Sequence, residues 1–384
     1  MPTCEMVDHF VDSGSVDAPV RGDLRQMCNG GASTYSAALG WVIRTSVCEG
    51  GIDGSLTYHQ TETDGARRMI NFPEWPCRLL TFGNSFTQGS QVSDGETWQE
   101  VLAAHFQEPV RNYGVGGYSV YQAYLRMQAV LSETPARYVI LNIWDDDHFR
   151  NLDDWRAIRF GASGRFTLPH IRVDDETGKC LEVENRCQTP EELYRLCDYD
   201  YIWDSYKNDS ILNALDSIAE NNDGKLIRYG QDNSRFDGNA TARQMAQTEP
   251  DSQIRMVYTE KALAASRFVI DKAKEITSEI GAELLVILSF SRTSVADELR
   301  GKARFDQSFL DWLHQQHTPF IDLRDAFKSE FEAVGGRDIE NYLDRYFIGH
   351  HTPIGNSFFA ASTRRRLVDW LDPRPLPYQH SHRG

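Results

Sequence analysis

The stretch LLTFGNSFTQGS, from Leu79 to Ser90, consists of an apolar run, a glycine turn and a serine. A continuous apolar run that ends in Gly83 is typical of a parallel strand buried on both faces of a sheet. Ser85 would then stand at a turn between a strand and a helix, where a hydrolase presents its nucleophile. The turn by itself is weak evidence, because Gly, Asn and Ser are common in turns of every kind.

The pattern of this first strand recurs along the chain. Segments with helical spacing of apolar residues separate five apolar runs, and such alternation predicts a doubly wound parallel sheet of the α/β class. We expect the first helix to follow a cap at Asp94 and the longest helix to end at Gly281. The five predicted strands are residues 78–82, 109–113, 137–144, 282–291 and 318–323.

Shifts in composition divide the chain into segments. Residues 1–75 are rich in Gly, Ser, Asp and Thr, and they predict an irregular extension with a few short strands, packed on an α/β domain of residues 76–372. Within that domain, residues 151–255 lack the alternation of strands and helices, and a stretch of this length indicates an insertion or a lid. Residues 373–384 form a C-terminal tail.

The insertion contains two local patterns. Residues 165–183 predict a hairpin whose turn is formed by residues 174–179. Thr189, followed three residues later by Glu192, is a capping-box signature and predicts the start of a helix. The aromatic residues of the insertion either pack a small core of its own or wall a substrate site.

The balance of charge limits the partners. The chain has 384 residues with 56 acids and 40 bases, and its net charge of −16 argues against nucleic acid and anionic membranes, because both would be repelled. No apolar run approaches the length of a membrane-spanning helix, and no signal peptide is visible. Seven cysteines without a CxxC pair fit reduced thiols. We therefore expect a cytoplasmic protein, and the oligomeric state stays open.

Four short blocks carry a family resemblance: GNSFTQGS, NYGVGGYS, NIWDDDHFRN and GHHTPIGN. Their order and spacing resemble those of the SGNH (GDSL-like) hydrolases, over residues 37–372 with the insertion as an interruption. The resemblance implies a flavodoxin-like three-layer fold and serine-dependent hydrolysis of acyl esters without a cofactor. It also implies small-molecule or carbohydrate esters as substrates.

Taken block by block, the resemblance implies three roles. Ser85 would be the nucleophile, and its own N–H, close to the N-terminus of a helix, would help to bind the oxyanion. Gly117 would supply the second N–H donor, because a residue without Cβ lets the backbone approach the substrate. His350 would be the general base, in the HxxPxG form of the last block, with His351 as the competing candidate.

The chain departs from the family at the first and third blocks. Asn84 stands where the family has Asp, a change that keeps a hydrogen-bond acceptor for the turn. Asp146, followed by Asp147, stands where the family has an Asn that donates to the oxyanion. An ionised carboxylate would repel the oxyanion. Either Asp146 is protonated, or it turns away and Asn142 or Asn151 supplies the amide.

A third departure concerns the carboxylate that orients the base. The family places an Asp two or three residues before the histidine, where this chain has Ile348 and Phe347. Asp344, six residues upstream of His350, is one possible replacement. The other is an acid from residues 145–147, because a triad needs a carboxylate on the second imidazole nitrogen and no fixed sequence position.

The acid loop also raises a metal hypothesis. Three consecutive acids followed by His148 would suit Mn²⁺ or Mg²⁺. Alternation along an extended chain divides them between two sides, so we expect no metal. The alternatives to ester hydrolysis are acyl transfer to another acceptor and a binding protein that has lost catalysis. Four side chains near the blocks are candidates for contacts with the substrate: Asn84, Asn142, His148 and His351.

Overall fold

The computed structural model describes residues 20–22, 33–155, 167–206 and 252–379. A parallel sheet of five strands lies at its centre, in the order β12-β11-β8-β6-β7. Numbered along the chain and taken from the β7 edge, this is the order 2-1-3-4-5 of flavodoxin-like doubly wound sheets, as predicted. All five strands coincide with the predicted apolar runs: β6 Leu79–Phe82, β7 Arg111–Asn112, β8 Tyr138–Trp144, β11 Glu283–Ser289 and β12 Phe320–Asp322.

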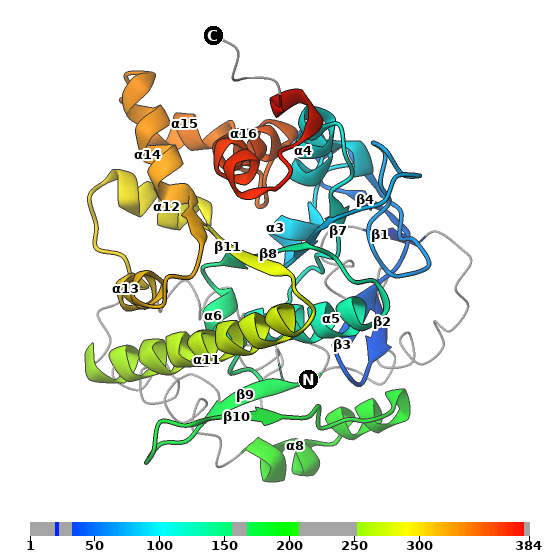
Figure 1. Cartoon of the computed structure of the whole chain (residues 1–384). Coiled ribbons are helices and arrows are strands. Elements are labelled where there is room, and N and C mark those ends of the chain that lie inside the picture. The colour runs from blue at the N-terminus through cyan, green and yellow to red at the C-terminus, as the bar shows by residue number, and fades with distance from the viewer. Residues whose placement is uncertain (1–19, 23–32, 156–166, 207–251, 380–384) are drawn as a thin grey trace.

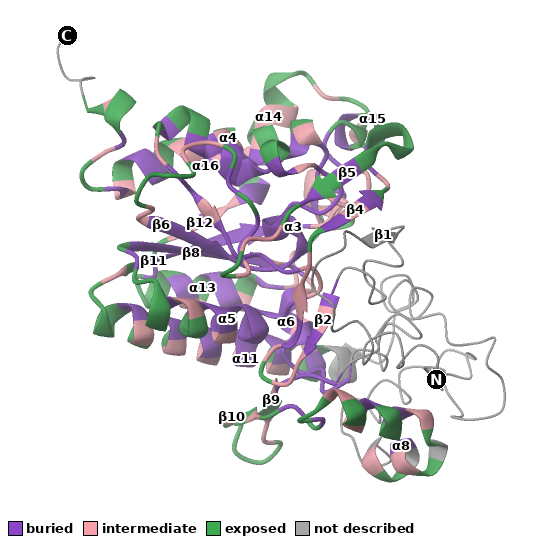
Figure 2. Ribbon diagram, turned by 90° about the vertical axis from the view of Figure 1, so that its right-hand side faces the viewer, coloured by how far each residue is buried: buried purple, intermediate pink, exposed green. Residues whose placement is uncertain are grey.

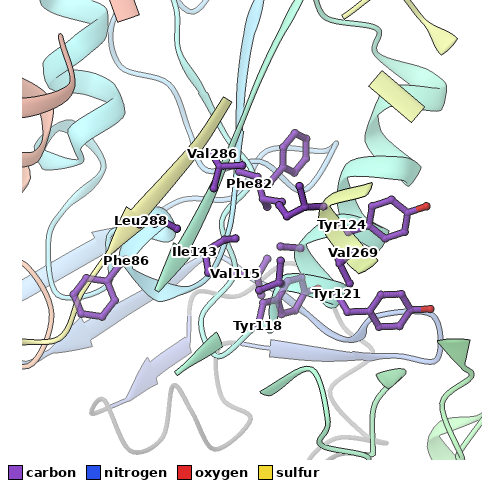
Figure 3. Close-up of a cluster of buried hydrophobic side chains, with 14 of the residues drawn as sticks. Phe82, Phe86, Val115, Tyr118, Tyr121, Tyr124, Ile143, Val269, Val286 and Leu288 are labelled. Carbon is purple, nitrogen blue, oxygen red and sulfur yellow. The ribbon is translucent and has the colours of Figure 1, made fainter. Parts of the chain in front are cut away.

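Helices cover both faces of the sheet and complete the three layers of the fold (Figures 1 and 2). Because successive strand residues point to opposite faces, Leu79 packs in one hydrophobic cluster and Leu80 in the other. The cluster around Leu79 includes residues of α4 (Trp98–Phe106) and α16 (Pro353–Trp370), whereas that around Leu80 includes residues of α5 (Val120–Glu133) and α11 (Ser252–Glu279). Figure 3 shows part of the second cluster, with Phe82, Ile143 and Val286 of the strands near Tyr121, Tyr124 and Val269 of the helices.

Shorter helices follow the strands or lie at the edges of the domain. Among the helices of the described ranges, none combines the length and the apolar character needed to cross a membrane. These shorter helices are α3 Ser85–Gln88, α6 Asp147–Arg150, α12 Arg292–Leu299, α13 Gln307–Gln315, α14 Leu323–Ala333, α15 Ile339–Asp344 and the 3₁₀ turn η6 Leu376–Tyr378.

One of the two predicted helix boundaries is confirmed and the other is wrong. Gly281 follows α11 with φ of +69°, the left-handed conformation that ends a helix. The helix expected after Asp94 begins later, because the side chain of Thr97 accepts from the N–H of Glu100 and caps α4. Asp94 instead starts a 3₁₀ turn, η3 (Asp94–Glu96), and its carboxylate pairs with buried Arg67 at 2.8 Å.

The N-terminal extension contains the short strands that its composition predicted. They form a sheet of order β1-β4-β5 and a hairpin of β2 and β3. The hairpin contacts the α/β domain, since Trp41 donates from Nε1 to the carbonyl oxygen of Gly116 at 3.0 Å and accepts from Tyr118 Oη at 2.5 Å through its own carbonyl. The elements are β1 Val20–Gly22, β2 Ser33–Ser36, β3 Gly40–Ile43, β4 Ser46–Glu49, the 3₁₀ turn η2 Ile52–Gly54 and β5 Leu56–His59.

The described part of the insertion confirms one local prediction and corrects another. Strands β9 (His170–Val173) and β10 (Cys180–Val183) form the predicted antiparallel hairpin. Thr189 is the N-cap of a 3₁₀ segment, so the predicted start is confirmed, but the capping-box bonds are not formed: its side chain makes no capping bond and Glu192 accepts from the N–H of Gln188. A 3₁₀ segment, η5 (Pro190–Cys197), and helix α8 (Tyr199–Tyr206) follow. Residues 156–166 and 207–251 of the predicted insertion lie outside the described residues.

Candidate active site

Ser85 and His350 lie together at the carboxyl end of β6. Ser85 is the first residue of α3, separated from β6 by Gly83 and Asn84, and His350 lies in the loop before α16. The Oγ of Ser85 and the Nε2 of His350 are 2.8 Å apart, within hydrogen-bond distance. The position is the one where doubly wound sheets bind ligands, because the strand order reverses between β6 and its neighbours.

Asn84 builds the turn that presents Ser85. Its carbonyl oxygen accepts from the N–H groups of Thr87 (3.0 Å) and Gln88 (2.8 Å), and its Oδ1 accepts from Phe86 N–H at 2.8 Å. Its Nδ2 donates to Asp147 at 2.9 Å. Asn84 is fully buried and its side chain is bound within the protein at both ends. It therefore shapes the turn, which corrects the expectation that it contacts the substrate.

Gly83 makes this turn possible because no side chain fits there. Its φ is +152°, and a Cβ would lie 2.6 Å from the carbonyl oxygen of Asn142 and 2.2 Å from Oγ1 of Thr87. Real Cβ atoms do not approach other atoms so closely, so the close passage of the chain between β6 and β8 requires glycine. The strand can then turn directly into Ser85.

The Nδ1 nitrogen of His350 faces the side-chain amide of Gln91, at the position where the sequence predicts an acid. Nδ1 of His350 lies 2.9 Å from Oε1 of Gln91, and the same oxygen accepts from the backbone N–H of His350 at 2.8 Å. The Nε2 of Gln91 donates to the carbonyl oxygens of Gly50 (2.6 Å) and Ile348 (3.1 Å). Asp344, one of the expected acids, is turned outward and pairs with Arg292 at 2.7 Å.

The three acids after β8 are engaged in other contacts. Asp145 accepts from the backbone N–H and the hydroxyl of Ser291, the N-cap of α12. Asp146 pairs with Nε of Arg150 at 2.8 Å, and Asp147 pairs with Nη1 of the same guanidinium at 2.8 Å. The expectation that one of these acids orients His350 is corrected, since Gln91 occupies that position.

Arg150 sets the charge around the site. Its guanidinium lies 5.0 Å from the centre of the Trp144 ring and balances the two acids beside it. Burial, and secondarily the positive charge of Arg150, lowers the pKa of His350 to about 4. Burial raises the pKa of Asp147 to about 7, although Arg150 acts in the opposite direction. His350 is therefore neutral at pH 7, as a general base must be.

The glycine loop after β7 runs beside the serine. A Cβ on Gly116 would lie 3.7 Å from Cβ of Ser85, and the N–H of Gly116 donates to Oε1 of Gln88 at 2.6 Å. Gly117 has φ of +82°, and a Cβ there would lie 3.0 Å from the Trp41 ring. The predicted role of the Gly117 N–H as an oxyanion donor stays a prediction.

His351 and Asn142 are structural side chains. His351 is 3% exposed and packs edge-on against Phe86, with 4.9 Å between ring centres. Burial lowers its pKa to about 3. Asn142 is 1% exposed and donates from Nδ2 to Oγ1 of Thr87 at 3.0 Å. Both side chains are enclosed by the protein, and of the two histidines it is His350 whose ring lies within hydrogen-bond distance of Ser85.

His148 and Asn151 join α6 and the loop after it to α11. Nδ1 of His148 lies 2.7 Å from Oγ of Ser266, and Nδ2 of Asn151 donates to the same hydroxyl at 2.9 Å. This corrects the expected contact of His148 with the substrate and the alternative amide at Asn151. Within the described ranges, no group of three or more His, Cys, Asp or Glu side chains is arranged to hold a metal ion.

Gln91, Arg67 and Arg150 were missed by the sequence analysis. Gln91 is the residue immediately after the GNSFTQGS block. Its φ is +71°, and no sequence pattern predicts a positive φ at a residue other than glycine. Arg67 lies in the extension, where no pattern marks one buried arginine. The one available signal was Arg150, four residues after Asp146, a spacing that favours an ion pair on a helix.

The fold and these contacts define the class of protein: a parallel α/β domain with a hydrogen-bonded serine and histidine at the carboxyl edge of its sheet. Comparison with protein-family models gives no match, and comparison with curated proteins gives none either. One similar solved structure is that of a "putative lipolytic protein of G-D-S-L family" from Desulfitobacterium hafniense DCB-2. The identity is 12%, the match covers 75% of this chain and 97% of that chain, and the TM-score is 0.35. A likeness at this level carries no information about the residues of the site.

Proposed function

We propose that the protein is a serine-dependent hydrolase of acyl esters. The observation that carries the proposal is the distance of 2.8 Å between Oγ of Ser85 and Nε2 of His350, which puts nucleophile and base within reach of proton transfer. Ser85 attacks the acyl carbon as His350 takes its proton, and His350 then protonates the departing alcohol. Water, deprotonated by His350, releases the acid from the acyl-enzyme and regenerates Ser85.

The oxyanion would be bound by the N–H groups of Ser85 and Gly117. The N–H groups of the next three residues of α3 all donate to Asn84, so the N–H of Ser85 is the one at the open end of the turn. Asp146 does not weigh against this arrangement as the sequence alone suggested, because its charge is paired with Arg150. The resulting site needs no metal or organic cofactor for the chemistry.

The substrate would be a small-molecule or carbohydrate ester. The chain carries a net charge of −16, which favours neutral or cationic substrates over anionic ones. The resemblance of the four blocks to SGNH (GDSL-like) hydrolases supports the same class. Acyl transfer to a second alcohol uses the same two residues, and product analysis with added alcohols or sugars distinguishes it from hydrolysis.

Labelling with a fluorophosphonate probe tests the proposal. We expect intact-mass analysis to find one adduct on the wild type, mapped to Ser85, and none on Ser85→Ala. His350→Ala should label at least about 100-fold more slowly, because the base is lost. Ser132→Ala changes a serine on the exposed face of α5 and is the matched control, which should label as the wild type does.

The same variants should be compared in hydrolysis of p-nitrophenyl acetate. Turnover by the wild type above the Ser85→Ala background supports the esterase. A folded wild type that neither takes up the probe nor turns over the ester would contradict the proposal and favour a binding protein.

A further inference from the structure

We propose that Gln91 is a positioning residue that holds His350 in the tautomer a general base requires, in place of the expected acid. The inference rests on the proposed function, because it concerns the base of that reaction. Gln91 has no part in the family blocks. It is assigned here from its four hydrogen bonds, which join the loop after α3 to the extension and to the loop before α16.

The orientation of the Gln91 amide is fixed by its hydrogen-bond partners. Its two ends look alike in shape, so their identity follows from their partners. One end faces the carbonyl oxygens of Gly50 and Ile348, which only accept hydrogen bonds, so that end is the NH₂ group. The other end faces the backbone N–H of His350, which only donates, so that end is the carbonyl oxygen Oε1. Backbone groups on both sides fix the amide in one orientation.

The tautomer of His350 follows from the orientation of the Gln91 amide. Because Oε1 of Gln91 only accepts, the Nδ1 that lies 2.9 Å from it must carry a proton. Neutral imidazole has one proton, so Nε2 is left with a lone pair directed at Oγ of Ser85, 2.8 Å away. During attack the Ser85 proton moves to Nε2, while the Nδ1 proton stays on its bond to Gln91. An amide thus does the orienting work of the usual carboxylate.

Gln91 is itself held in an unfavourable backbone conformation. Its φ of +71° is unfavourable for a residue with a side chain, and such strain persists only where the surroundings impose it. Arg67 is 2% exposed, and its side chain donates hydrogen bonds to loop residues before and after Gln91. Gly349 leaves room on the other side, since a Cβ there would lie 2.9 Å from Oε1. Arg67 donates to the carbonyl oxygens of Gln88 (2.6 Å), Gly89 (2.7 Å) and Val92 (2.5 Å) and to the carboxylate of Asp94 (2.8 Å).

The neutral amide has an electrostatic consequence. A carboxylate would stabilise the imidazolium and raise the pKa of His350, whereas an amide orients the ring without adding charge. Of the charged groups near His350, Arg150 of α6 also disfavours the imidazolium. The two neighbouring histidines, His59 of β5 and His351, are buried and have lowered pKa values themselves, so neither ring adds a stabilising negative charge. His350 therefore keeps its free lone pair at mildly acidic pH.

The test compares Gln91→Glu and Gln91→Leu with the wild type. Long-range ¹H–¹⁵N spectra identify which ring nitrogen of His350 carries the proton, with His350→Ala to assign the signal, and the rate of ester hydrolysis is measured against pH. Gln122→Glu is the matched control. Gln122, like Gln91, is a buried glutamine that bridges backbone groups: it accepts from Ser119 N–H and donates to the carbonyl oxygen of Leu39.

We expect wild-type His350 to be protonated on Nδ1. Gln91→Leu should give a mixture of tautomers and lower kcat by about 10²- to 10⁴-fold. Gln91→Glu should restore the Nδ1–H tautomer, recover part of kcat, and move both the pKa of His350 and the acidic limb of kcat/KM up by about 1 to 3 pH units. Gln122→Glu should leave the tautomer and the pH profile at the wild-type positions.

Two results would overturn the inference: protonation of wild-type His350 on Nε2, or a His350 pKa that is the same in folded Gln91→Glu as in the wild type. Because both readings come from the spectra of resting protein, they hold even if the wild type proves inactive. Failure of the proposed function would instead be an unlabelled Ser85 with the Nδ1–H tautomer intact. If Gln91→Leu does not fold, the Gln91→Glu titration still decides.

Discussion

Gly83 constrains the path of the chain from the end of β6 to Ser85. The chain passes so close to β8 that a single methyl group would meet backbone, which cannot move aside as a flexible side chain can. The conflict is therefore relieved only by shifting the strand or the turn. Both shifts would carry Ser85 away from His350.

Gly83→Ala should accordingly lower the free energy of unfolding by about 1–3 kcal/mol or more, from overpacking together with an unfavourable φ. Urea unfolding measures the loss. Gly178→Ala is the matched control, because Gly178 also has a positive φ (+68°) but has open space around its Cβ position. It should lose only the backbone contribution of about 1 kcal/mol. Equal losses in the two variants would mean that the clash at Gly83 is relaxed without cost.

At the scale of elements, the Arg67 contacts tie the extension to the loop between α3 and η3. The ion pair with Asp94 is buried on both sides, at 2% and 8% side-chain exposure, and the guanidinium also donates to four backbone carbonyl oxygens. Removing a buried charge of this kind leaves its buried partners without the hydrogen bonds that they made to it.

Arg67→Ala should lower the free energy of unfolding by about 3–5 kcal/mol, because the Asp94 carboxylate is left buried and unpaired. Arg374→Ala removes the arginine of the more exposed pair with Asp369 and should change it by at most about 1 kcal/mol. Denaturant midpoints of the two variants make the comparison. A loss at Arg67 no greater than at Arg374 would show that the loop does not depend on the tether.

The elements differ in how well they could be predicted from the sequence. The five strands were predictable because each is an apolar run that a two-faced sheet must bury, as in residues 137–144. The start of α4 was not, since Asp94 and Thr97 are both good caps and the choice was made by Arg67, which lies 27 residues before Asp94. Ser85 and His350 were singled out because their blocks resemble those of the SGNH (GDSL-like) hydrolases, with His351 as the competing candidate. Gln91 was not, because its function comes from backbone groups at Gly50 and Ile348 that no local pattern indicates.

At the scale of the whole molecule, four buried neutral histidines of the described residues couple stability to pH. Burial is the first cause that lowers the pKa of each, to about 4 for His148 and His350, to about 3 for His351 and well below the usual value for His59. Unfolded histidines titrate near 6.5, so the unfolded chain binds more protons below that pH. The stability that the neutral rings contribute is complete above about pH 6.5 and is lost as pH falls toward 4.

His148→Asn should therefore weaken the fall in stability between pH 7 and pH 5, because asparagine can keep the bond to Ser266 but does not titrate. Its absolute stability will be lower at pH 7, so the comparison is of slopes, taken from urea midpoints. Asp147, whose raised pKa acts in the opposite direction, is common to both proteins and cancels. His317→Asn, at an exposed position, should leave the slope unchanged. A wild-type slope in His148→Asn would mean that this ring does not titrate on unfolding.

The bond between Ser85 and His350 joins positions 265 residues apart in the chain. On a ribosome that adds about 5–20 residues per second, the serine emerges roughly 15 to 50 s before its base has been synthesised. Throughout that interval β6 and its turn can form, but Ser85 lacks the histidine that accepts its proton in the proposed reaction. The proposed ester hydrolysis therefore becomes possible only after the chain has been synthesised through His350.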